Sequence, residues 1–214
     1  IPPLIVKEAI KRGIDLIAIT DHNASENIQS VMKAARGTGL TVLPGMELQT
    51  AEEIHILCLF DTLDQVKTLQ ETVDNTLPDI KNNIEYFGEQ FIVDETGGFI
   101  QRKDILLINS TRLSFEEAYR VVNELDGLFI PAHVNRQAFG LIYRLGFVPP
   151  EPQLNALEIS RHLSPDEAIV KFPQLAAFPL IQSGDVHYLA DFLGANRFSI
   201  TKPTISEIKM ALKG

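Results

Sequence analysis

The chain has 214 residues, of which 45% are hydrophobic and 22% are charged. This composition suits one globular domain with a sizeable core, and it excludes a disordered chain, a collagen-like repeat and a disulfide-stapled miniprotein. The formal net charge of −9 opposes binding to a phosphate backbone unless bound cations or a local basic patch reverse the field. We therefore expect that extended nucleic acid is not a partner.

Strand-like apolar runs alternate with amphipathic segments along the chain. Pro2 and Pro3 suit the first turn of a helix that runs to about Arg12, and Gly13 ends it. The predicted strands are residues 15–20, 40–46, 54–60, 128–132, 156–160, 180–183 and 197–200. Capping boxes, in which Ser or Thr precedes Glu by three residues, predict helix starts at Ser114, Ser164 and Thr204.

The strand–helix–strand alternation predicts parallel pairing, and the apolar strands predict a sheet covered on both faces. A (β/α) barrel or a doubly wound sheet follows, within a single domain that spans residues 1–214. Residues 77–108 interrupt the alternation. The turn Glu95-Thr96-Gly97-Gly98 predicts a hairpin inserted there, between runs at 91–93 and 99–100.

The longest apolar runs are strand-sized, far below the roughly 18 residues that a membrane helix needs, so no membrane partner is expected. Cys58, the single cysteine, lies in an apolar run and cannot form an intramolecular disulfide, which favours a reducing cytoplasm. The chain opens on Ile1 without an initiator Met, so we expect further residues upstream. Nothing in the residue pattern indicates an oligomeric state.

Side chains that bind metals follow the predicted strands. They are Asp21, His22, Glu47, His133, Asp185 and His187. In a barrel, the C-terminal ends of the strands share the rim where active sites are built. His55 begins its strand and reaches that rim only if a hairpin follows Glu47. Singly, each of these residues has a structural explanation as a core histidine or a helix cap; together, histidine and carboxylate without cysteine suit zinc, manganese or iron in a hydrolytic centre.

Four motifs in order resemble the polymerase and histidinol phosphatase (PHP) family. They are Thr20-Asp21-His22-Asn23, Pro44-Gly45-Met46-Glu47 followed by His55-Ile56-Leu57, Pro131-Ala132-His133, and Ser183-Gly184-Asp185-Val186-His187. The resemblance covers nearly the whole chain. It implies a distorted seven-stranded (β/α) TIM-like barrel whose first strand is missing from this sequence, with two or three divalent metal ions at its C-terminal rim, of zinc, manganese or iron, magnesium also being possible.

The resemblance also implies a ligand set. Glu47 and Asp185 would serve one metal, Glu47, His55 and His133 a second, and His22 with His187 a third. Asp185 or His187 would pass a proton to the leaving group. The family's opening His-x-His motif has no match in the sequence; it is expected upstream of Ile1, and its true absence would instead favour a non-catalytic binding module.

Four further residues complete the predicted site. Arg136 and Arg161 are candidate phosphate clamps, although surface ion pairs are an equal alternative for both. Asn23 is expected either to orient a ligand or to cap a helix, and Asp21 to orient the His22 ring by accepting its other N–H. The leading hypothesis is a cytoplasmic metal-dependent phosphoesterase that hydrolyses a small phosphorylated substrate with a metal-activated water. A nuclease-type phosphodiesterase is the alternative enzyme.

Overall fold

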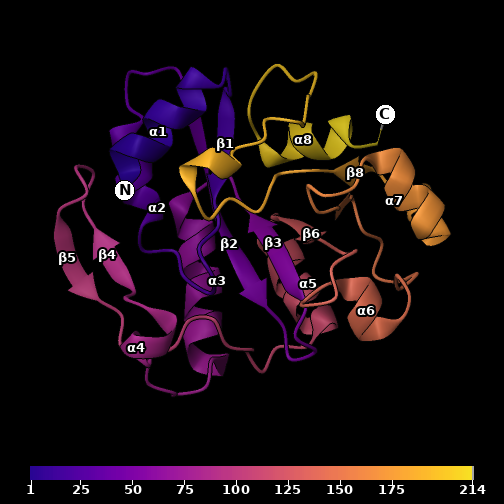
Figure 1. The fold of residues 1–214 in the computed structure, drawn as a ribbon, viewed down its shortest axis with the longest axis horizontal. Helices are drawn as coiled ribbons and strands as arrows, with labels where there is room; N and C mark the ends of the chain where they lie inside the picture. Colours follow the sequence, from indigo (N-terminus) through magenta and orange to yellow (C-terminus); the bar gives the residue numbers. More distant parts are fainter. Residues whose placement is uncertain (214) are drawn as a thin grey trace.

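The computed structural model describes residues 1–213 and has a mixed α/β fold (Figure 1). Helix α1 (Pro2–Lys11) begins with proline in its first turn and leads into strand β1 (Leu16–Ile19). Gly13 adopts a left-handed φ of +67° in the turn between them, a conformation that glycine reaches without steric cost. The predicted helix and its glycine stop are confirmed.

A four-stranded sheet in the order β1-β2-β3-β6 forms the centre of the described chain. Strand β2 (Thr41–Gln49) is parallel to β1, whereas β3 (His55–Leu59) is antiparallel to both β2 and β6 (Leu128–Pro131). The expectation of parallel pairing throughout is therefore wrong for β3. Only residues 50–54 connect β2 to β3, and a parallel crossover needs about a dozen residues or more.

Strands β7 (Leu157–Glu158) and β8 (Leu180–Ile181) form a separate parallel pair. The backbone N–H of Val134 donates to the carbonyl of Glu158 and so joins the end of β6 to β7. Within residues 1–213, strand hydrogen bonds do not close a barrel. The strand expected at 197–200 has no pairing partner there and is irregular.

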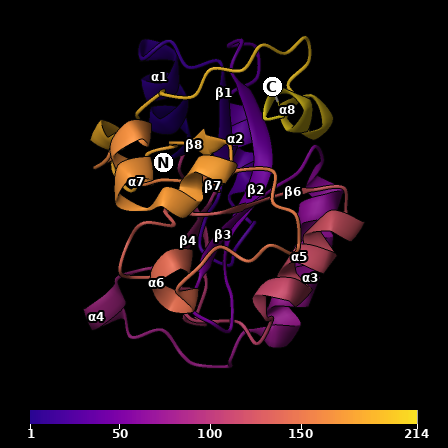
Figure 2. The same cartoon turned by 90° about the vertical axis from the view of Figure 1, so that its right-hand side faces the viewer.

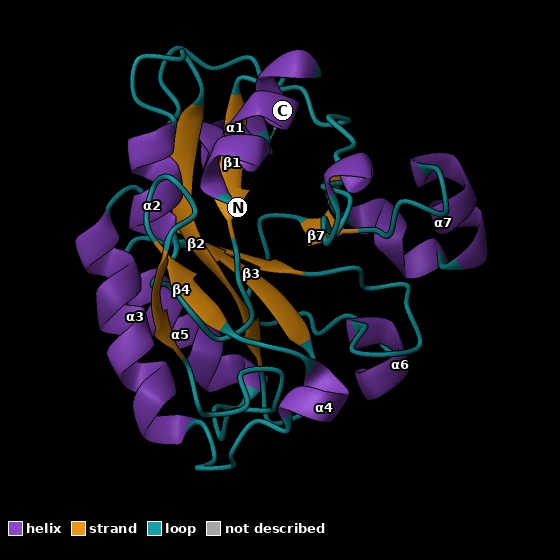
Figure 3. Ribbon diagram, turned by 60° about the vertical axis from the view of Figure 1, so that its left-hand side comes forward, coloured by secondary structure: helices purple, strands orange, loops and turns teal. Residues whose placement is uncertain are grey.

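Helices cover both sides of the sheet (Figures 2 and 3). Helices α3 (Leu63–Thr76) and α5 (Phe115–Glu124) lie along one side, whereas α6 (Leu141–Leu145) and α7 (Pro165–Lys171) lie on the other. Helix α2 (Ile28–Ala34) contacts α1 and β2, and α8 (Ile205–Ala211) is near the C-terminus. Two short 3₁₀ turns span Pro173–Ala177 and Leu189–Asp191.

Side-chain alternation on β2 and β3 separates the core from the site. Met46, Leu48, Ile56 and Cys58 are fully buried in the main hydrophobic core. Because successive strand residues point to opposite faces, Glu47, Gln49 and His55 face away from this core. Burial raises the pKa of the Cys58 thiol, so this cysteine is packed as a small hydrophobe.

The capping boxes at Ser114 and Ser164 are confirmed, since each Ser side chain and the Glu three residues on bond each other's backbone N–H. At Thr204 only half of the box forms. Its side chain accepts from Glu207 N, but the Glu207 carboxylate accepts from the backbone of Thr201 and Lys202.

The inserted segment contains the predicted hairpin. Helix α4 (Ile84–Phe87) precedes β4 (Phe91–Val93), which pairs with β5 (Phe99–Arg102) across the predicted turn. Ser30 on α2 donates to the Val93 carbonyl at 2.6 Å and docks the hairpin against that helix. None of the helices in residues 1–213 combines the length and apolarity that a membrane crossing requires.

Candidate metal centre

The β2–β3 hairpin places Glu47 and His55 on one face. Gln49 pairs with His55 and Glu47 pairs with Leu57, so Glu47 and His55 are diagonal neighbours. Glu47 Oε1 lies 3.0 Å from His55 Nδ1, and both side chains are buried. The structure thus contains the hairpin that the sequence required to bring His55 to Glu47.

His133 joins this pair from the end of β6. Its Nε2 lies 3.3 Å from Glu47 Oε1 and 3.3 Å from His55 Nδ1, so three potential ligand atoms converge. The residue adopts a left-handed φ of 31°, which is uncommon for a side chain of this size and persists only where the surroundings enforce it. The loop after β6 is therefore built to turn this imidazole toward Glu47.

The hydrogen bonds of His55 indicate what this site lacks. Gln49 Nε2 donates to Ser110 Oγ at 2.9 Å, which leaves Gln49 Oε1 to accept from His55 Nε2 at 3.2 Å. A neutral His55 then carries its lone pair on Nδ1, facing a carboxylate oxygen at 3.0 Å. Two acceptors at that distance need a proton or a cation between them, so these residues fit a metal ion.

His22 closes the cluster from the end of β1, where it forms an isolated parallel bridge with Glu47. Its Nδ1 is buried, has no hydrogen-bond partner among residues 1–213 and lies 3.6 Å from Glu47 Oε2. Burial lowers the pKa of His22, so the ring is neutral at pH 7 and free to donate a lone pair. One ligand atom from each of His22, Glu47 and His55 lies within 4.8 Å of the others.

Glu47 is the electrostatic centre of the cluster. Burial raises the pKa of Glu47, but its contacts with the imidazole rings of His133, His55 and His22 outweigh that effect, and the pKa lies well below the usual range. A carboxylate that remains ionised while buried among three imidazoles is suited to bridging cations.

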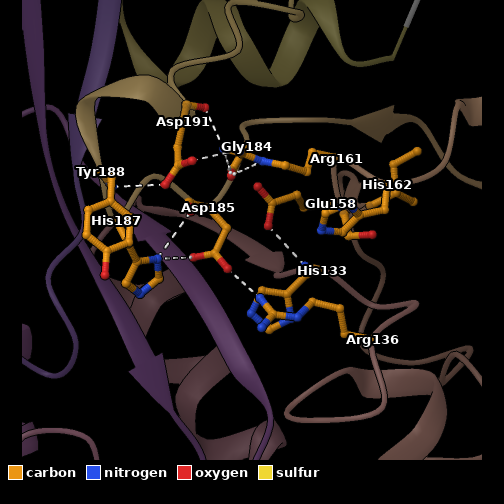
Figure 4. Close-up of a pocket in the computed structure, with 12 residues that line it drawn as sticks. His133, Arg136, Glu158, Arg161, His162, Gly184, Asp185, His187, Tyr188 and Asp191 are labelled. Carbon is orange, nitrogen blue, oxygen red and sulfur yellow. Dashed lines mark hydrogen bonds and ion pairs between the residues drawn. The ribbon is translucent and has the colours of Figure 1, made fainter. Parts of the chain in front are cut away.

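Asp185 and His187 lie beside the cluster on the loop after β8. The His187 ring centroid is 6.0 Å from that of His22, and its Nδ1 is 3.3 Å from Asp185 Oδ1. Asp185 has a left-handed φ of 48° and is ion-paired with Arg136 Nη1. The two residues therefore face a pocket that opens next to the buried histidines (Figure 4).

This pocket has a volume of about 420 Å³, within the range of small-molecule sites. Arg161 lines it but is engaged by the protein, as Figure 4 shows. It donates to the Gly184 carbonyl from Nε and Nη2, at 3.0 and 2.7 Å, and to Asp191 Oδ1 at 2.8 Å. Arg161 therefore forms an ion pair with Asp191, which is one of its two predicted roles. Its bonds to the Gly184 carbonyl anchor the loop that carries Asp185.

Two other predicted residues lie away from the pocket. Asn23 is fully buried; its Nδ2 donates to the carbonyls of Leu107 and Asn109, both at 2.8 Å, and its Oδ1 accepts from Gln49 N. Its amide is therefore committed to the backbone, and no atom is left for a ligand. The Asp21 carboxylate accepts from Asn27 Nδ2 at 3.2 Å, and in residues 1–213 it makes no hydrogen bond to the His22 ring.

Sequence reasoning missed two residues. Gln49 sets the orientation of His55, and Glu158 accepts from the backbone N–H groups of His133 and Ser183, at 3.0 and 3.3 Å. Burial raises the pKa of Glu158. The position of Glu158 at the end of a predicted strand was the one signal that pointed to this rim.

The structure is an α/β protein with a histidine–carboxylate cluster that could hold a metal ion. A family model described as the PHP domain matches residues 2–134, more than half of the chain. The chain belongs to the PHP family, which is metal-dependent, and the resemblance drawn from the four motifs is confirmed. A curated relative, an uncharacterized protein of Streptococcus pneumoniae, is 27% identical in an alignment of 67 residues that covers 27% of this chain and 26% of the relative.

Solved structures support the fold. A lesion-specific endonuclease from Pyrococcus furiosus superposes with a TM-score of 0.72 and 22% identity over 99% of this chain. A complex of endonuclease Q with a 27-mer duplex that carries an abasic lesion superposes with a TM-score of 0.71 and 22% identity, also over 99% of this chain. The chain spans about half of each, 50% and 51%. A protein from Bifidobacterium adolescentis, provisionally named a metal-dependent phosphoesterase, gives 0.59 and 17%, with 99% of this chain and 90% of that chain covered.

These similarities correct the expectation that extended nucleic acid is not a partner. Two of the structures similar to this chain are endonucleases, and one of them is bound to duplex DNA. Net charge averages over a whole surface, whereas the field at a site is set locally by its arginines and any bound cations. The charge of −9 therefore does not remove nucleic acid from the candidate substrates.

Proposed function

We propose that this protein is a metal-dependent phosphoesterase. The observation that carries the proposal is the convergence of Glu47 Oε1, His55 Nδ1 and His133 Nε2 within 3.3 Å of one another. These three residues would hold one divalent cation. His22, whose buried Nδ1 lacks a partner near Glu47 Oε2, would hold a second with His187 and Asp185 at the pocket side. Zinc, manganese and iron all suit this ligand set.

Bound divalent cations supply a water of lowered pKa and neutralise charge on the phosphoryl oxygens. The protein's own residues complete the site. The His187 side chain is 57% exposed at the pocket mouth and its Nδ1 faces Asp185, so its Nε2 would remain for the cation while Nδ1 and Asp185 would share a proton and pass it to the leaving oxygen. Arg136, which lines the same pocket, would contact the phosphoryl group.

We further propose a nucleic-acid phosphodiester as the substrate. The support is the similarity in fold to the two endonuclease structures. A pocket of about 420 Å³ has the size of sites that enclose one drug-sized unit, so a single nucleotide at a strand end or lesion would enter it.

The test combines metal binding with hydrolysis. The purified protein is stripped with EDTA, titrated with Mn²⁺ or Zn²⁺, and incubated with a labelled duplex that carries an abasic site, and separately with bis(p-nitrophenyl) phosphate. We expect cation-dependent cleavage that falls at least about 100-fold in Glu47→Gln and Asp185→Asn, because each removes a ligand charge. Glu71→Gln, an exposed charge on α3, is the control. Failure to bind cations, or full activity in both site variants, would refute the proposal.

A further inference from the structure

Two arginines line the pocket, and their hydrogen bonding differs. Arg161 uses Nε, Nη1 and Nη2 for contacts to Gly184 and Asp191. Arg136, among the described residues, uses Nη1 alone, for Asp185. Its Nε and Nη2 groups have no protein acceptor, so most of its donor fork is available to an anion.

The backbone beneath Arg136 is fixed. Its N–H donates to the His133 carbonyl at 2.9 Å, and the loop closes so tightly at Gly140 that a Cβ there would lie 2.2 Å from the Arg136 carbonyl oxygen. The side chain, by contrast, is 42% exposed. A partly exposed guanidinium thus extends from a hydrogen-bonded backbone anchor three residues after a proposed ligand, His133.

Asp185 is the point where this guanidinium meets the metal centre. One of its oxygens is bound by Arg136 and the other lies 3.3 Å from His187 Nδ1, whose ring neighbours that of His22. A divalent cation and a guanidinium are both cations that seek this carboxylate. When one is bound to it, the other is disfavoured by like-charge repulsion.

We propose that Arg136 is a switch between Asp185 and the substrate phosphate. Without a cation at Asp185, the arginine neutralises that carboxylate. When Asp185 serves a cation, the guanidinium is released and its free fork binds phosphate oxygens in the pocket. Cation binding and phosphate binding then strengthen each other, reciprocally. This inference rests on the proposed function, and it adds an order of assembly: the arginine becomes available once the cation is in place.

The first experiment needs no metal. Orthophosphate binding is measured by calorimetry in EDTA for the native protein, Asp185→Asn and the double variant Asp185→Asn/Arg136→Gln. The amide releases the arginine, so we expect Asp185→Asn to bind phosphate about 5-fold to 10-fold more tightly, as loss of a charge-assisted pair would allow. The double variant should lose this gain. A gain that persists in the double variant, or no gain in Asp185→Asn, would overturn the switch.

The second experiment measures Mn²⁺ affinity by calorimetry in Arg136→Gln. Competition predicts tighter binding than in the native protein, by about 3-fold to 10-fold for loss of a competing charge. An arginine that merely oriented Asp185 would give weaker binding, which would overturn the switch, as would unchanged affinity. Arg102→Gln is the matched control, since Arg102 is 45% exposed and pairs with Glu89 on the inserted hairpin.

The two experiments separate this inference from the proposed function. If the native protein binds no Mn²⁺, the proposed function fails and the coupling fails with it, whatever the phosphate data show. If Mn²⁺ binds and Arg136→Gln leaves its affinity unchanged, the metal centre stands and the switch alone is overturned. Circular dichroism of each variant confirms that the fold is retained before affinities are compared.

Discussion

Glu158 Oε2 accepts a hydrogen bond from the backbone N–H of His133 at 3.0 Å, while its Oε1 accepts from Ser183 N at 3.3 Å. One buried side chain thus joins the loop that carries His133 to the loop that carries Asp185. Metal centres depend on such outer contacts, because they fix the orientation of the ligands.

Replacing Glu158 should separate its two contributions. Glu158→Ala leaves two buried N–H groups without an acceptor, and we expect the free energy of unfolding to fall by about 2–4 kcal/mol. Glu158→Gln keeps one acceptor but turns an amide NH2 toward the other N–H group, so its cost should be about 1–2 kcal/mol, smaller than that of alanine. Urea denaturation measures both. Equal losses in the two variants would show that the charge itself, and not its acceptor atoms, stabilises this junction.

Gln49→Leu tests how His55 is oriented. Leucine has a side-chain volume similar to that of glutamine but offers no acceptor to His55 Nε2–H. The ring therefore loses the contact that directs its Nδ1 lone pair to Glu47. Loss of such an outer partner lowers metal affinity by about 10-fold to 100-fold. Mn²⁺ titration checks this, and Gln49→Glu, which keeps an acceptor, should retain most of the affinity. Native affinity in Gln49→Leu would contradict this role.

Asn23 should matter for stability and not for substrate binding. Asn23→Gly keeps the left-handed backbone (φ 48°) but loses the bonds to the Leu107 and Asn109 carbonyls, and we expect unfolding to be easier by about 2–3 kcal/mol. Asn23→Ala should cost about 1 kcal/mol more, because alanine disfavours this backbone conformation. Urea denaturation of both variants gives the difference. A glycine variant as stable as the native protein would show that this clamp contributes nothing.

Acidification should destabilise the metal-free protein through His22. Burial lowers the folded-state pKa of His22 below its ordinary value of 6.5, so below that pH the unfolded chain binds more protons. Stability present above pH 6.5 is therefore lost as the pH falls, with a slope of at most about 1.4 kcal/mol per pH unit for one proton. Thermal denaturation in EDTA between pH 7.5 and 5.5 measures it. His22→Gln should flatten the slope; an unchanged slope would assign the effect to other groups.

The sequence predicted where the strands lie better than which of them pair in parallel and which in antiparallel. The strands at β2 and β3 were predicted because they are strand-sized apolar runs, but such a run shows only that both faces of a strand are covered, and an antiparallel strand can be covered in the same way. The strand predicted at 197–200 was wrong for a related reason. Phe198 and Ile200 do pack against a hydrophobic cluster, yet within residues 1–213 no neighbouring strand supplies the hydrogen bonds that a strand needs.

For the candidate site, the sequence likewise predicted the residue types but not all of their contacts. Residue types that bind metals were visible as motifs, and the structure brings His22, Glu47, His55 and His133 together. Gln49 gave no signal in the sequence, and Glu158 was visible only as a carboxylate at the end of a predicted strand, because the importance of both residues lies in the contacts they make in space. Arg161 was predicted to be either a phosphate clamp or an ion-pair partner, because an arginine fork binds the oxygens of phosphates and of carboxylates in similar ways. Only the neighbours in space distinguish these two uses.

The β2–β3 hairpin has one more consequence, for folding. Its register pairs Gln49 with His55, and a slip of one residue would turn His55 to the opposite face, into the hydrophobic core. A cation that requires both Glu47 and His55 would bind the correct register and not the slipped one. Ligand binding stabilises whichever state it prefers. A bound metal would therefore stabilise the native register of β2 and β3 over the slipped one. Correct folding of the nascent chain would then depend on metal supply before any substrate is present.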